Sequence, residues 1–504
     1  IATADDWKAF CDLVNGGQIT VDAKLTKNID LGGNVWMIGK NGKPYSGTFD
    51  GDGHTLSIDW NVISEAAPFF YTSGGATIKN LHTKGKITTT SKGASGLIDR
   101  VVGKTTICKC ISEVDITSSY AISACQASGF VSFNKSKKGD LTITDCIVKG
   151  TFNATTERGS RGMSGFVFNQ EAVCTISNSL YLGSNNGGVW SRTFAQDATI
   201  NNCYYLNPCG TAQGTQVTEK QLKNGYVTKL LQADRTDACY WAQQLGEMPS
   251  LFNGNTWAVN RIYYDTVDQR WECNELNTSD YLSVGMDFYA LRTHFDRNIK
   301  ANKPYTVTLP CEWSNSTDKV YVLSSVNKAK GMASFSQVEN NVNGEFHSFE
   351  AYKPYLVVPT NNLSYIGGSI ECLVYAEPDT PVAEDVNGVQ WRATYEGLTN
   401  AEAVAAGAYI LQSDGLFHKV TENTVATIPP YRAYITLSSD NQASGAKQLS
   451  ISLGGETTGI RAIETTDQDG TVRYYDLQGR YIGNTLDGQP KGIYIKNGKK
   501  VINQ

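Results

Sequence analysis

The segment Leu141-Thr-Ile-Thr-Asp-Cys146 decides the fold, because imperfect copies of it recur through the first half of the chain. Each copy has Thr-Ile, two residues that are mostly polar, and then a small or apolar residue. The isoleucines lie 29, 36, 33 and 24 residues apart, and such a period indicates stacked repeats. The other copies are Ala76-Thr-Ile-Lys-Asn-Leu81, Thr105-Thr-Ile-Cys-Lys-Cys110, Cys174-Thr-Ile-Ser-Asn-Ser179 and Ala198-Thr-Ile-Asn-Asn-Cys203.

A second motif interleaves with the first and reads Ala94-Ser-Gly-Leu-Ile98, Ala127-Ser-Gly-Phe-Val131 and Met163-Ser-Gly-Phe-Val167. Short alternating stretches rich in β-branched residues predict strands, and Asn, Gly and Ser between them predict turns. A coil of short strands buries its apolar face only against the next coil, so equivalent positions should form ladders. The predicted inward rows are Ile78, Ile107, Ile143, Ile176 and Ile200 and, beside them, Leu81, Cys110, Cys146, Ser179 and Cys203.

Helices are predicted at both ends of this repeat region. Thr3 is suited to be the N-cap of a helix that buries Trp7, Phe10, Cys11 and Val14 and covers the open first coil. Thr218-Glu-Lys-Gln221 reads as a capping box. The short helix after it would bury Leu222, Val227, Leu230 and Leu231 as a C-terminal cap.

Three segments resemble known bacterial sequences. Tyr45-Ser-Gly-Thr-Phe-Asp-Gly-Asp-Gly-His-Thr-Leu56 resembles a coil of bacterial β-helix proteins, and the Ser-Gly-Leu/Phe-Ile/Val motif resembles the GLUG repeat of bacterial surface proteins. Trp241-Ala-Gln-Gln-Leu-Gly-Glu-Met-Pro-Ser-Leu251 resembles the tail that closes such regions. The resemblance covers about residues 1–252. It implies a right-handed parallel β-helix with an adhesin-like surface role and no catalytic site.

The second half lacks the repeat. Residues 253–277 are predicted to be a connector, and residues 278–456 a β-sandwich-like domain of longer alternating strands such as Tyr355-Leu-Val-Val358. Phrases such as Ala351-Tyr-Lys-Pro-Tyr-Leu356 resemble a secreted β domain of gut Bacteroidetes. Residues 457–504 resemble the C-terminal sorting module of such proteins, with a hairpin turn at Asn497-Gly498; an ordinary terminal hairpin is the equal alternative. The whole is therefore predicted to be all-β.

Charge and hydropathy bear on which partners and which cellular location the sequence predicts. The 504 residues carry a net charge of -5, which does not indicate the basic surface that nucleic-acid binding needs. No run of 18 apolar residues predicts a transmembrane segment. The chain begins at Ile1 without an apolar leader, and we infer that a signal segment was removed from a secreted or outer-surface protein.

Twelve cysteines admit two interpretations. Several fall at one fixed place in the repeat, which favours free thiols in a stacked core. The alternative is one or more disulfides, of which Cys203–Cys209 would be the first.

No residue pattern predicts a catalytic or metal site. Asp50, Asp52 and His54 cluster, but they lack the spaced ligands of a calcium loop and fit a tight polar turn. The five histidines form no zinc motif, and no cofactor motif occurs. The acids of the repeat region share no coil position; they are Asp99, Glu113, Asp115, Asp145, Glu157, Glu171 and Asp197.

The leading hypothesis is a non-enzymatic adhesin-like protein that binds an extracellular glycan or a host or bacterial surface protein. Trp190, Tyr204 and Tyr205 could stack on sugar rings, although the sequence assigns no binding residue. The first alternative is a carbohydrate-active enzyme, either a polysaccharide lyase or a glycoside hydrolase, with a β-helix cleft. The second is a structural spacer. The sequence indicates no oligomeric state.

Overall fold

A computed structural model describes the chain except for residues 135–139, 170–171, 316–317, 328–329, 340–346, 369, 438–446, 455, 458–473, 476–480, 491, 497–498 and 504. The contacts divide it into two compact units. The first comprises residues 1–277, 282–293 and 368–377, and the second comprises residues 278–281, 294–367 and 378–504. The four-part division expected from the sequence stays a prediction.

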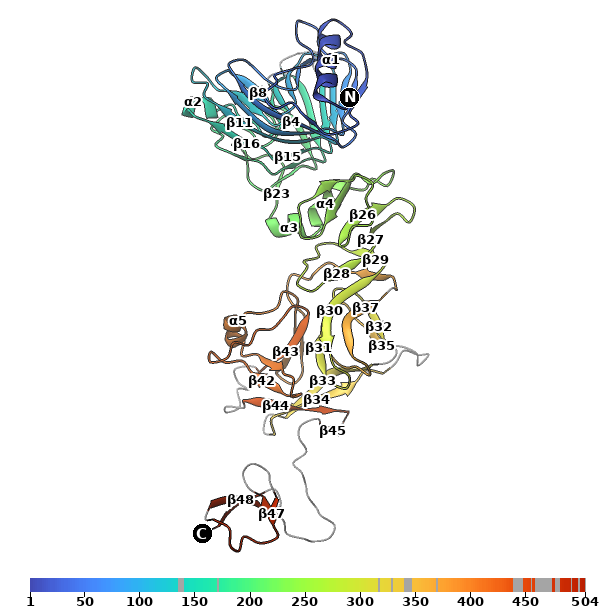
Figure 1. Ribbon diagram of the computed structural model, residues 1–504, viewed down its shortest axis with the longest axis vertical. Coiled ribbons are helices and arrows are strands. Elements are labelled where there is room, and N and C mark those ends of the chain that lie inside the picture. Colours follow the sequence, from blue (N-terminus) through green and yellow to red (C-terminus); the bar gives the residue numbers. More distant parts are fainter. Residues whose placement is uncertain are drawn as a thin grey trace. The chain divides into compact units, whose positions relative to one another are not determined.

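The first unit is built on a parallel β-helix, as predicted (Figure 1). One side is a seven-stranded parallel sheet that gains one strand from each coil. Its strands are β1 (Ala23–Lys24), β3 (Thr48–Asp50), β6 (Ala76–Lys79), β10 (Thr105–Cys108), β14 (Asp140–Thr144), β18 (Val173–Ser177) and β21 (Thr199–Asn201).

The next side of each coil belongs to a ten-stranded sheet. Its strands are β2 (Ile29–Asp30), β4 (Thr55–Val62), β7 (His82–Thr89), β11 (Ile111–Ser118), β15 (Ile147–Val148), β16 (Thr151–Ala154), β19 (Leu180–Tyr181), β20 (Ser184–Asn185), β22 (Tyr204–Tyr205) and β23 (Thr215–Gln216). Two smaller parallel sheets close the coil. They contain β5 (Phe69–Thr72), β9 (Ile98–Val101), β13 (Val131–Asn134) and β17 (Val167–Asn169), and β8 (Gly93–Ser95) with β12 (Gln126–Ser128).

The predicted isoleucine ladder is confirmed. Ile107 pairs with Ile78 on one side and Ile143 on the other, and the row continues through Ile176 to Ile200. The first four are fully buried, and together with the rows beside them they form one continuous core. Aligned apolar side chains therefore repeat the same burial in each coil.

Each coil turns between its two large sheets at a residue with a left-handed backbone. The residues at this corner are Asp52, Asn80, Lys109, Asp145, Asn178 and Asn202, with φ between 48° and 53°. Asn and Asp tolerate this conformation better than other non-glycine residues, which explains their recurrence. The following position is the predicted row of Leu81, Cys110, Cys146, Ser179 and Cys203, all buried.

The glycines of the second motif permit close stacking. A Cβ on Gly129 would lie 2.5 Å from the carbonyl oxygen of Gly165, and one on Gly165 would lie 1.9 Å from that of Thr193. The preceding serine is locked in place, since Ser128 Oγ donates to the Val131 carbonyl at 2.5 Å. The motif thus encodes a turn that touches its copy in the next coil.

Helix α1 (Ala4–Asn15) forms as predicted. Thr3 caps it in a reciprocal box with Asp6, and Trp7, Phe10, Cys11 and Val14 are buried. Trp7 packs edge-on against Phe49 and Phe69, which belong to the first coils. The helix therefore extends the β-helix core.

The second capping box is also confirmed: Thr218 and Gln221 begin α3 (Glu219–Lys223), and α4 (Tyr226–Gln232) follows. These helices and β24 (Trp241–Gln244) cover an outward row of the ten-stranded sheet, namely Ile147, Leu180 and Tyr204. Asp145, at a coil corner, receives two bonds of 2.8 Å from the Arg235 guanidinium and one of 2.9 Å from Trp241 Nε1.

Residues 253–277, expected as a connector, continue an antiparallel arrangement with β24. The sheet contains β25 (Ser250–Leu251), β24, β26 (Arg261–Asp265), β27 (Arg270–Cys273), β29 (Phe288–Ala290) and β38 (Cys372–Val374). Arg270 binds both carboxylate oxygens of Glu371 at 2.9 Å, which ties the returning segment 368–377 to this unit.

The core of the second unit lies within one mixed sheet. The order of its main path is β31 (Tyr305–Val307), β36 (Tyr355–Val358), β33 (Lys319–Asn327), β34 (Met332–Gln337), β44 (Gln448–Leu453), β42 (Phe417–Lys419), β41 (Tyr409–Leu411), β43 (Arg432–Leu437), β40 (Val389–Thr394) and β39 (Ala383–Asp385). The ring of Phe335 on β34 packs edge-on against Trp391 on β40. Strands distant in the sheet order thus meet face to face, as a sandwich-like fold requires.

Other elements of the chain are short. Strands β30 (Thr293–Ile299) and β37 (Leu363–Gly368) and helix α5 (Asn400–Ala405) accompany the large sheet, and β32 (Trp313–Asn315) pairs with β35 (His347–Phe349). Near the end of the chain, β48 (Gly492–Lys496) pairs antiparallel with β49 (Lys499–Asn503), while the expected turn at 497–498 lies outside the described residues. No helix in the described part has the length and apolarity needed to cross a membrane.

All twelve cysteines are free thiols. Cys110 and Cys146 donate to carbonyls of their own and the preceding coil, and Cys203 repeats the pattern. Cys209 instead donates to the Met163 carbonyl, so the expected alternative pair does not form a disulfide. Burial raises the pKa of Cys174, Cys203 and Cys209 to about 12, which keeps these thiols protonated.

The ladder predicts the cost of a gap. We expect Ile143→Ala to lower the free energy of unfolding by about 2–5 kcal/mol, because neighbouring coils hold the cavity open. Thr142→Ala, on the same strand but facing outward, should cost less than about 1 kcal/mol. Urea denaturation followed by tryptophan fluorescence measures both. Equal losses would contradict the assignment of Ile143 to the inward row.

Thiol reactivity provides a second check. The nine buried cysteines should resist an aromatic disulfide reagent in the folded chain, whereas all twelve should react in guanidinium chloride. A non-reducing peptide map that recovers a Cys203–Cys209 disulfide would contradict the thiol assignment.

Candidate functional site

The structure separates the three aromatic candidates found by sequence. Tyr204 and Tyr205 are buried at 8% and 6% exposure and belong to the core. Trp190, in contrast, is 54% exposed. Of these three, only the indole of Trp190 can therefore offer its face to a ligand.

Trp190 lies among loops that occupy the same place in consecutive coils. Just after these loops, the chain forms parallel β-bridges between successive coils. The bridged pairs are Ser128–Ser164, Ser164–Arg192 and Arg192–Thr211. Ile122 comes from one coil, the short helix α2 (Glu157–Ser160) from the next, and Trp190 from the third. Stacking of coils thus places side chains that are about 30 residues apart next to one another.

Contacts between the loops make this surface continuous. Arg158 donates to the Ile122 carbonyl at 3.4 Å, and the Arg161 guanidinium lies 6.0 Å from the centre of the Trp190 ring. Arg192 donates to the Val189 carbonyl at 3.4 Å. We call the set the Trp190 patch; it consists of Ile122, Arg158, Arg161, Val189, Trp190 and Arg192.

Local packing fixes the patch. Thr156 caps α2 and donates to the Tyr120 carbonyl at 3.0 Å, which joins two loops. Gly188 donates to the Ser160 carbonyl at 2.9 Å, and Ser191 Oγ donates to the same oxygen. A Cβ on Gly188 would lie 3.2 Å from Arg161 Cα, so glycine permits this close approach.

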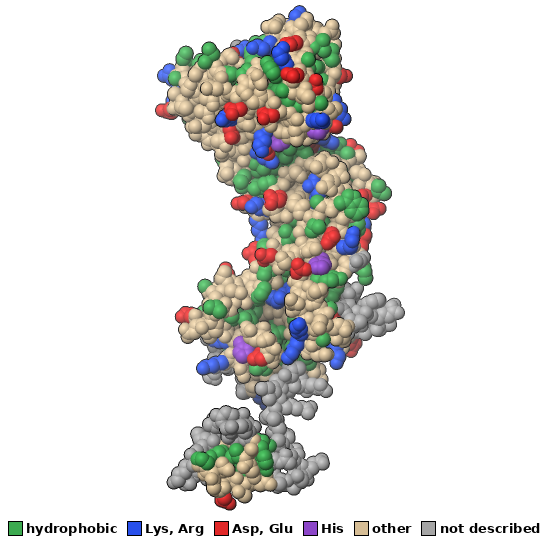
Figure 2. Space-filling model, in the orientation of Figure 1, with side chains coloured by type: hydrophobic (Ala, Val, Ile, Leu, Met, Phe, Trp, Pro, Cys, Tyr) green, Lys and Arg blue, Asp and Glu red, His purple; other side chains and the backbone are tan. Residues whose placement is uncertain are grey.

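The patch combines apolar surface with positive charge. Ile122 and Val189 are 76% and 71% exposed. Three arginines face one acid, Glu157, which pairs with Arg161 at 2.9 Å, so the local charge is positive on a chain whose net charge is -5. At the corner labelled α2 in Figure 1, Figure 2 shows apolar and charged side chains close together. An aromatic ring beside guanidinium groups suits a polymer with sugar faces and acidic or hydroxyl substituents.

The Asp50, Asp52 and His54 cluster forms a corner turn. Asp50 Oδ1 accepts from the Asp52 amide and from Asn80 Nδ2, both at 2.9 Å, and Asp52 pairs with Lys24 at 2.9 Å. The first bond closes the turn, and the other two join successive coils. Within the described residues, no group of three or more His, Cys, Asp or Glu side chains is placed to hold a metal ion.

If the chain were an enzyme, the buried Asp99 would be the candidate for its general acid or base. Burial raises its pKa to about 7, despite Arg100 at 3.3 Å, and Glu65 lies 3.4 Å from the same arginine. A carboxyl that titrates near neutrality beside a second carboxylate resembles an acid–base pair. However, its side chain is 1% exposed, so a substrate cannot reach it in this conformation.

A second polar row crosses three coils. His82 Nε2 lies 3.3 Å from Glu113, and Lys149 lies 2.9 Å from the other oxygen of Glu113. The hydrogen-bonding influence of His82, followed by that of Lys149, lowers the pKa of Glu113 to about 2. Glu113 is thus a permanently charged partner of two bases and unsuited to proton transfer near neutral pH.

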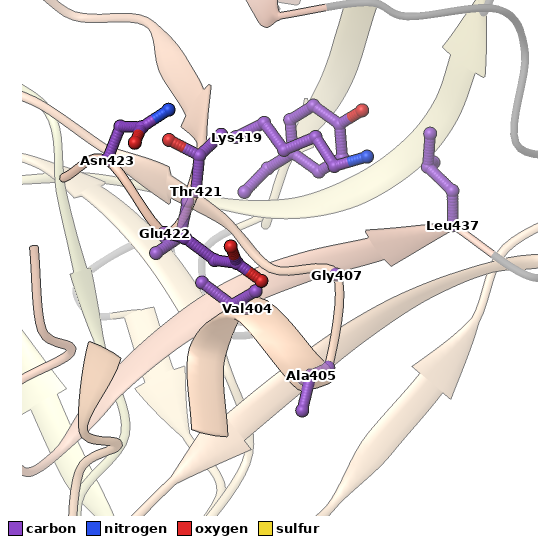
Figure 3. A pocket seen from close by; sticks show the side chains of 11 residues that line it. Val404, Ala405, Gly407, Lys419, Thr421, Glu422, Asn423 and Leu437 are labelled. Atoms are coloured by element: carbon purple, nitrogen blue, oxygen red, sulfur yellow. The ribbon is translucent and has the colours of Figure 1, made fainter. Parts of the chain in front are cut away.

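Two other hollows lie on the described surface. One, of about 380 Å³, is lined by corner residues including Asn80 and Lys109 and by the segment 251–253. The other, of about 490 Å³ in the second unit, lies between α5 and the turn after β42. Figure 3 shows the Lys419 ammonium and the Glu422 carboxylate pointing to different sides of this hollow. The described residues that line either hollow include no pair of carboxylates.

No protein-family model matches the sequence, and no curated protein matches it significantly. A Bacteroides ovatus structure, provisionally named an immunoglobulin A1 protease, is 16% identical, with 51% of this chain and 92% of that chain covered and a TM-score of 0.38. An IgA1 protease is 14% identical over 43% of this chain, which spans 20% of that protein, with a TM-score of 0.29.

A third structure is WceF of Pantoea stewartii, described as a glycan biofilm modifying enzyme with a tailspike-like parallel β-helix. It is 10% identical, with 86% of this chain and 72% of that chain covered and a TM-score of 0.15. Similarities this low carry no argument about activity. The parallel β-helix of this chain rests on its own strand pairing.

Sequence reasoning identified Trp190 but missed its basic neighbours. Arg158 and Arg161 lie outside the motifs that carry the repeat, so periodicity does not select them. A signal was present, since Glu157-Arg-Gly-Ser-Arg161 falls in the loop one coil before Trp190. Reading the loops in register, rather than the strands alone, would have brought them together.

The buried acid predicts a distinctive pH dependence. Asp99 is neutral in the folded chain up to about pH 7, whereas in the unfolded chain it ionises near pH 4. The folded state therefore loses stability from this group as pH rises from about 4 to 7, by up to about 4 kcal/mol. Relative to the parent, Asp99→Asn should gain about 2–4 kcal/mol in unfolding free energy between pH 5 and pH 8.

Asp59→Asn is the matched control, since Asp59 is 60% exposed and pairs with Lys86 on the surface. Urea denaturation at the two pH values should show that Asp59→Asn keeps the pH dependence of the parent, so its difference from the parent changes little between pH 5 and pH 8. If Asp99→Asn and Asp59→Asn respond alike, the neutral state of Asp99 is wrong.

Proposed function

We propose that this chain is a secreted or surface-associated, non-catalytic protein that binds an extracellular glycan through the Trp190 patch. The supporting observation is an exposed indole with Arg161 at cation–π distance, on a rigid stack of coils. A sugar ring packs its C–H face on such an indole, while guanidinium groups donate to hydroxyl or acidic oxygens.

The stacked scaffold suits a long polymer better than a small molecule. The patch is contributed by three successive coils, so neighbouring sugar units would meet neighbouring loops. It is a shallow surface, and binding would not require a closed pocket. A cell-surface polysaccharide is therefore the partner that we favour over a compact protein.

The alternative is a carbohydrate-active enzyme. Its supporting observation is the raised pKa of Asp99 next to Arg100 and Glu65. Such an enzyme would need the covering loops to open and expose Asp99. Release of reducing ends from a panel of polysaccharides, lost in Asp99→Asn, would establish this alternative and overturn the non-catalytic proposal.

The binding proposal is tested by affinity electrophoresis in gels that contain acidic or neutral polysaccharides. We expect retardation by at least one acidic polysaccharide, and Trp190→Ala should weaken it about tenfold, since loss of one stacked ring costs about 1–2 kcal/mol. Arg161→Gln should weaken it in the same direction.

Trp257→Ala is the matched control. Trp257 is also in the first unit and is 77% exposed, but it lies outside the patch. This variant should bind as the parent does. Absence of retardation by every polysaccharide, or equal loss in the two tryptophan variants, would refute the patch as the binding surface.

A further inference from the structure

A cavity in the second unit is lined by an arginine and, among the described residues, by no carboxylate. Arg432, the first residue of β43, lines a space of about 330 Å³. The described lining is otherwise neutral, and its polar side chains include Thr306, Gln412, Ser413 and Thr427.

The strands around Arg432 hold its backbone firmly. Arg432 pairs with Thr394 across β40, and the Ala433 amide donates to Thr306 Oγ1 on β31 at 3.1 Å. The arginine is therefore held where β43 passes between two neighbouring segments. Because the backbone of Arg432 is already fixed, less conformational entropy is lost when its side chain binds a ligand.

The guanidinium of Arg432 is only partly solvated. Burial lowers its pKa to about 10, so it remains charged at neutral pH. Among the described residues, no hydrogen bond or ion pair satisfies this side chain. A partly buried cation without an anion costs free energy that a bound anion would recover.

A second arginine reinforces the positive charge. Arg297 is 8% exposed and donates to the carbonyl oxygens of Thr306, Pro430 and Tyr431, the last at 2.6 Å. These carbonyl oxygens accept its hydrogen bonds, and no ion pair to Arg297 is present among the described residues. Thr306 lines the cavity, and Tyr431 directly precedes Arg432.

We propose that this cavity binds the carboxylate of an acidic sugar, with Arg432 as the direct ligand. The planar guanidinium can donate two parallel bonds to a carboxylate. The hydroxyl and amide side chains of Thr427, Ser413 and Gln412 provide groups for sugar hydroxyls. The volume lies at the small end of ligand pockets, which favours one sugar unit.

This cavity is separate from the Trp190 patch, since it lies in the second unit and is lined by other residues. With both sites, the chain would bind sugar-ring faces of an acidic polymer at the Trp190 patch and one acidic sugar unit of such a polymer in the Arg432 cavity. The two sites make independent predictions.

Isothermal titration calorimetry of the full chain tests the cavity. Glucuronic acid and N-acetylneuraminic acid should bind, whereas glucose, the neutral counterpart, should bind at least tenfold more weakly. Arg432→Met keeps the apolar stem and should weaken binding of the acidic sugars at least tenfold. Arg392→Met is the matched control: Arg392 lies on the neighbouring strand β40, bonds to Thr436 and does not line the cavity.

If Arg432→Met fails to fold by circular dichroism, Arg432→Lys replaces it; this variant keeps the charge but loses the paired donors, and should show a several-fold loss. Equal binding of glucuronic acid and glucose, or unchanged binding in the folded Arg432 variant, would overturn the proposal. Acetate binding as tightly as glucuronic acid would overturn the sugar assignment. Trp190→Ala should leave binding of these monosaccharides unchanged, so failure here is distinguishable from failure of the patch.

Discussion

In-register stacking of coils is the constraint on which the first unit depends. A single coil has a row of backbone groups on each edge and an apolar interior that it cannot bury alone. The pairing of Ile78, Ile107, Ile143 and Ile176 satisfies both needs at once, because it aligns hydrogen bonds and side chains together. Loss of register in one coil would displace the rows on both sides of it.

Stacking also decides where chemistry can be placed. The interior is filled by repeated apolar side chains, and the corners by left-handed residues that are Asn or Asp except for Lys109. Loops are free to vary because they leave the coil between its strands. The Trp190 patch arises there, so its residues are adjacent in space although they follow no sequence motif. A solenoid thus builds a surface from loops that are neighbours in register.

The sequence predicted what repeats. The isoleucine row, the small residues after each corner and the two capping boxes all have local or periodic signals, and the structure contains them. It did not predict the contact of Asp145 with Arg235 and Trp241, because these residues are about 90 residues apart and no pattern connects them. The same limit applies to segment 368–377, which joins the first unit through Arg270 and Glu371.

The candidate sites show the same distinction in physical terms. Aromatic residues are visible in a sequence, but whether Trp190 is exposed and Tyr204 buried depends on which loop or helix covers them. Tyr204 packs in a cluster with residues of α3 and α4 and is buried, whereas Trp190 stays 54% exposed. The same holds for charged residues: nothing in the sequence distinguishes Asp99 or Arg432. Burial, with the nearby Glu65 carboxylate, raises the pKa of Asp99 to about 7, and burial lowers the pKa of Arg432 to about 10. The candidate sites of this chain therefore depend on which side chains the fold leaves exposed and which charges it buries, and a sequence motif marks neither.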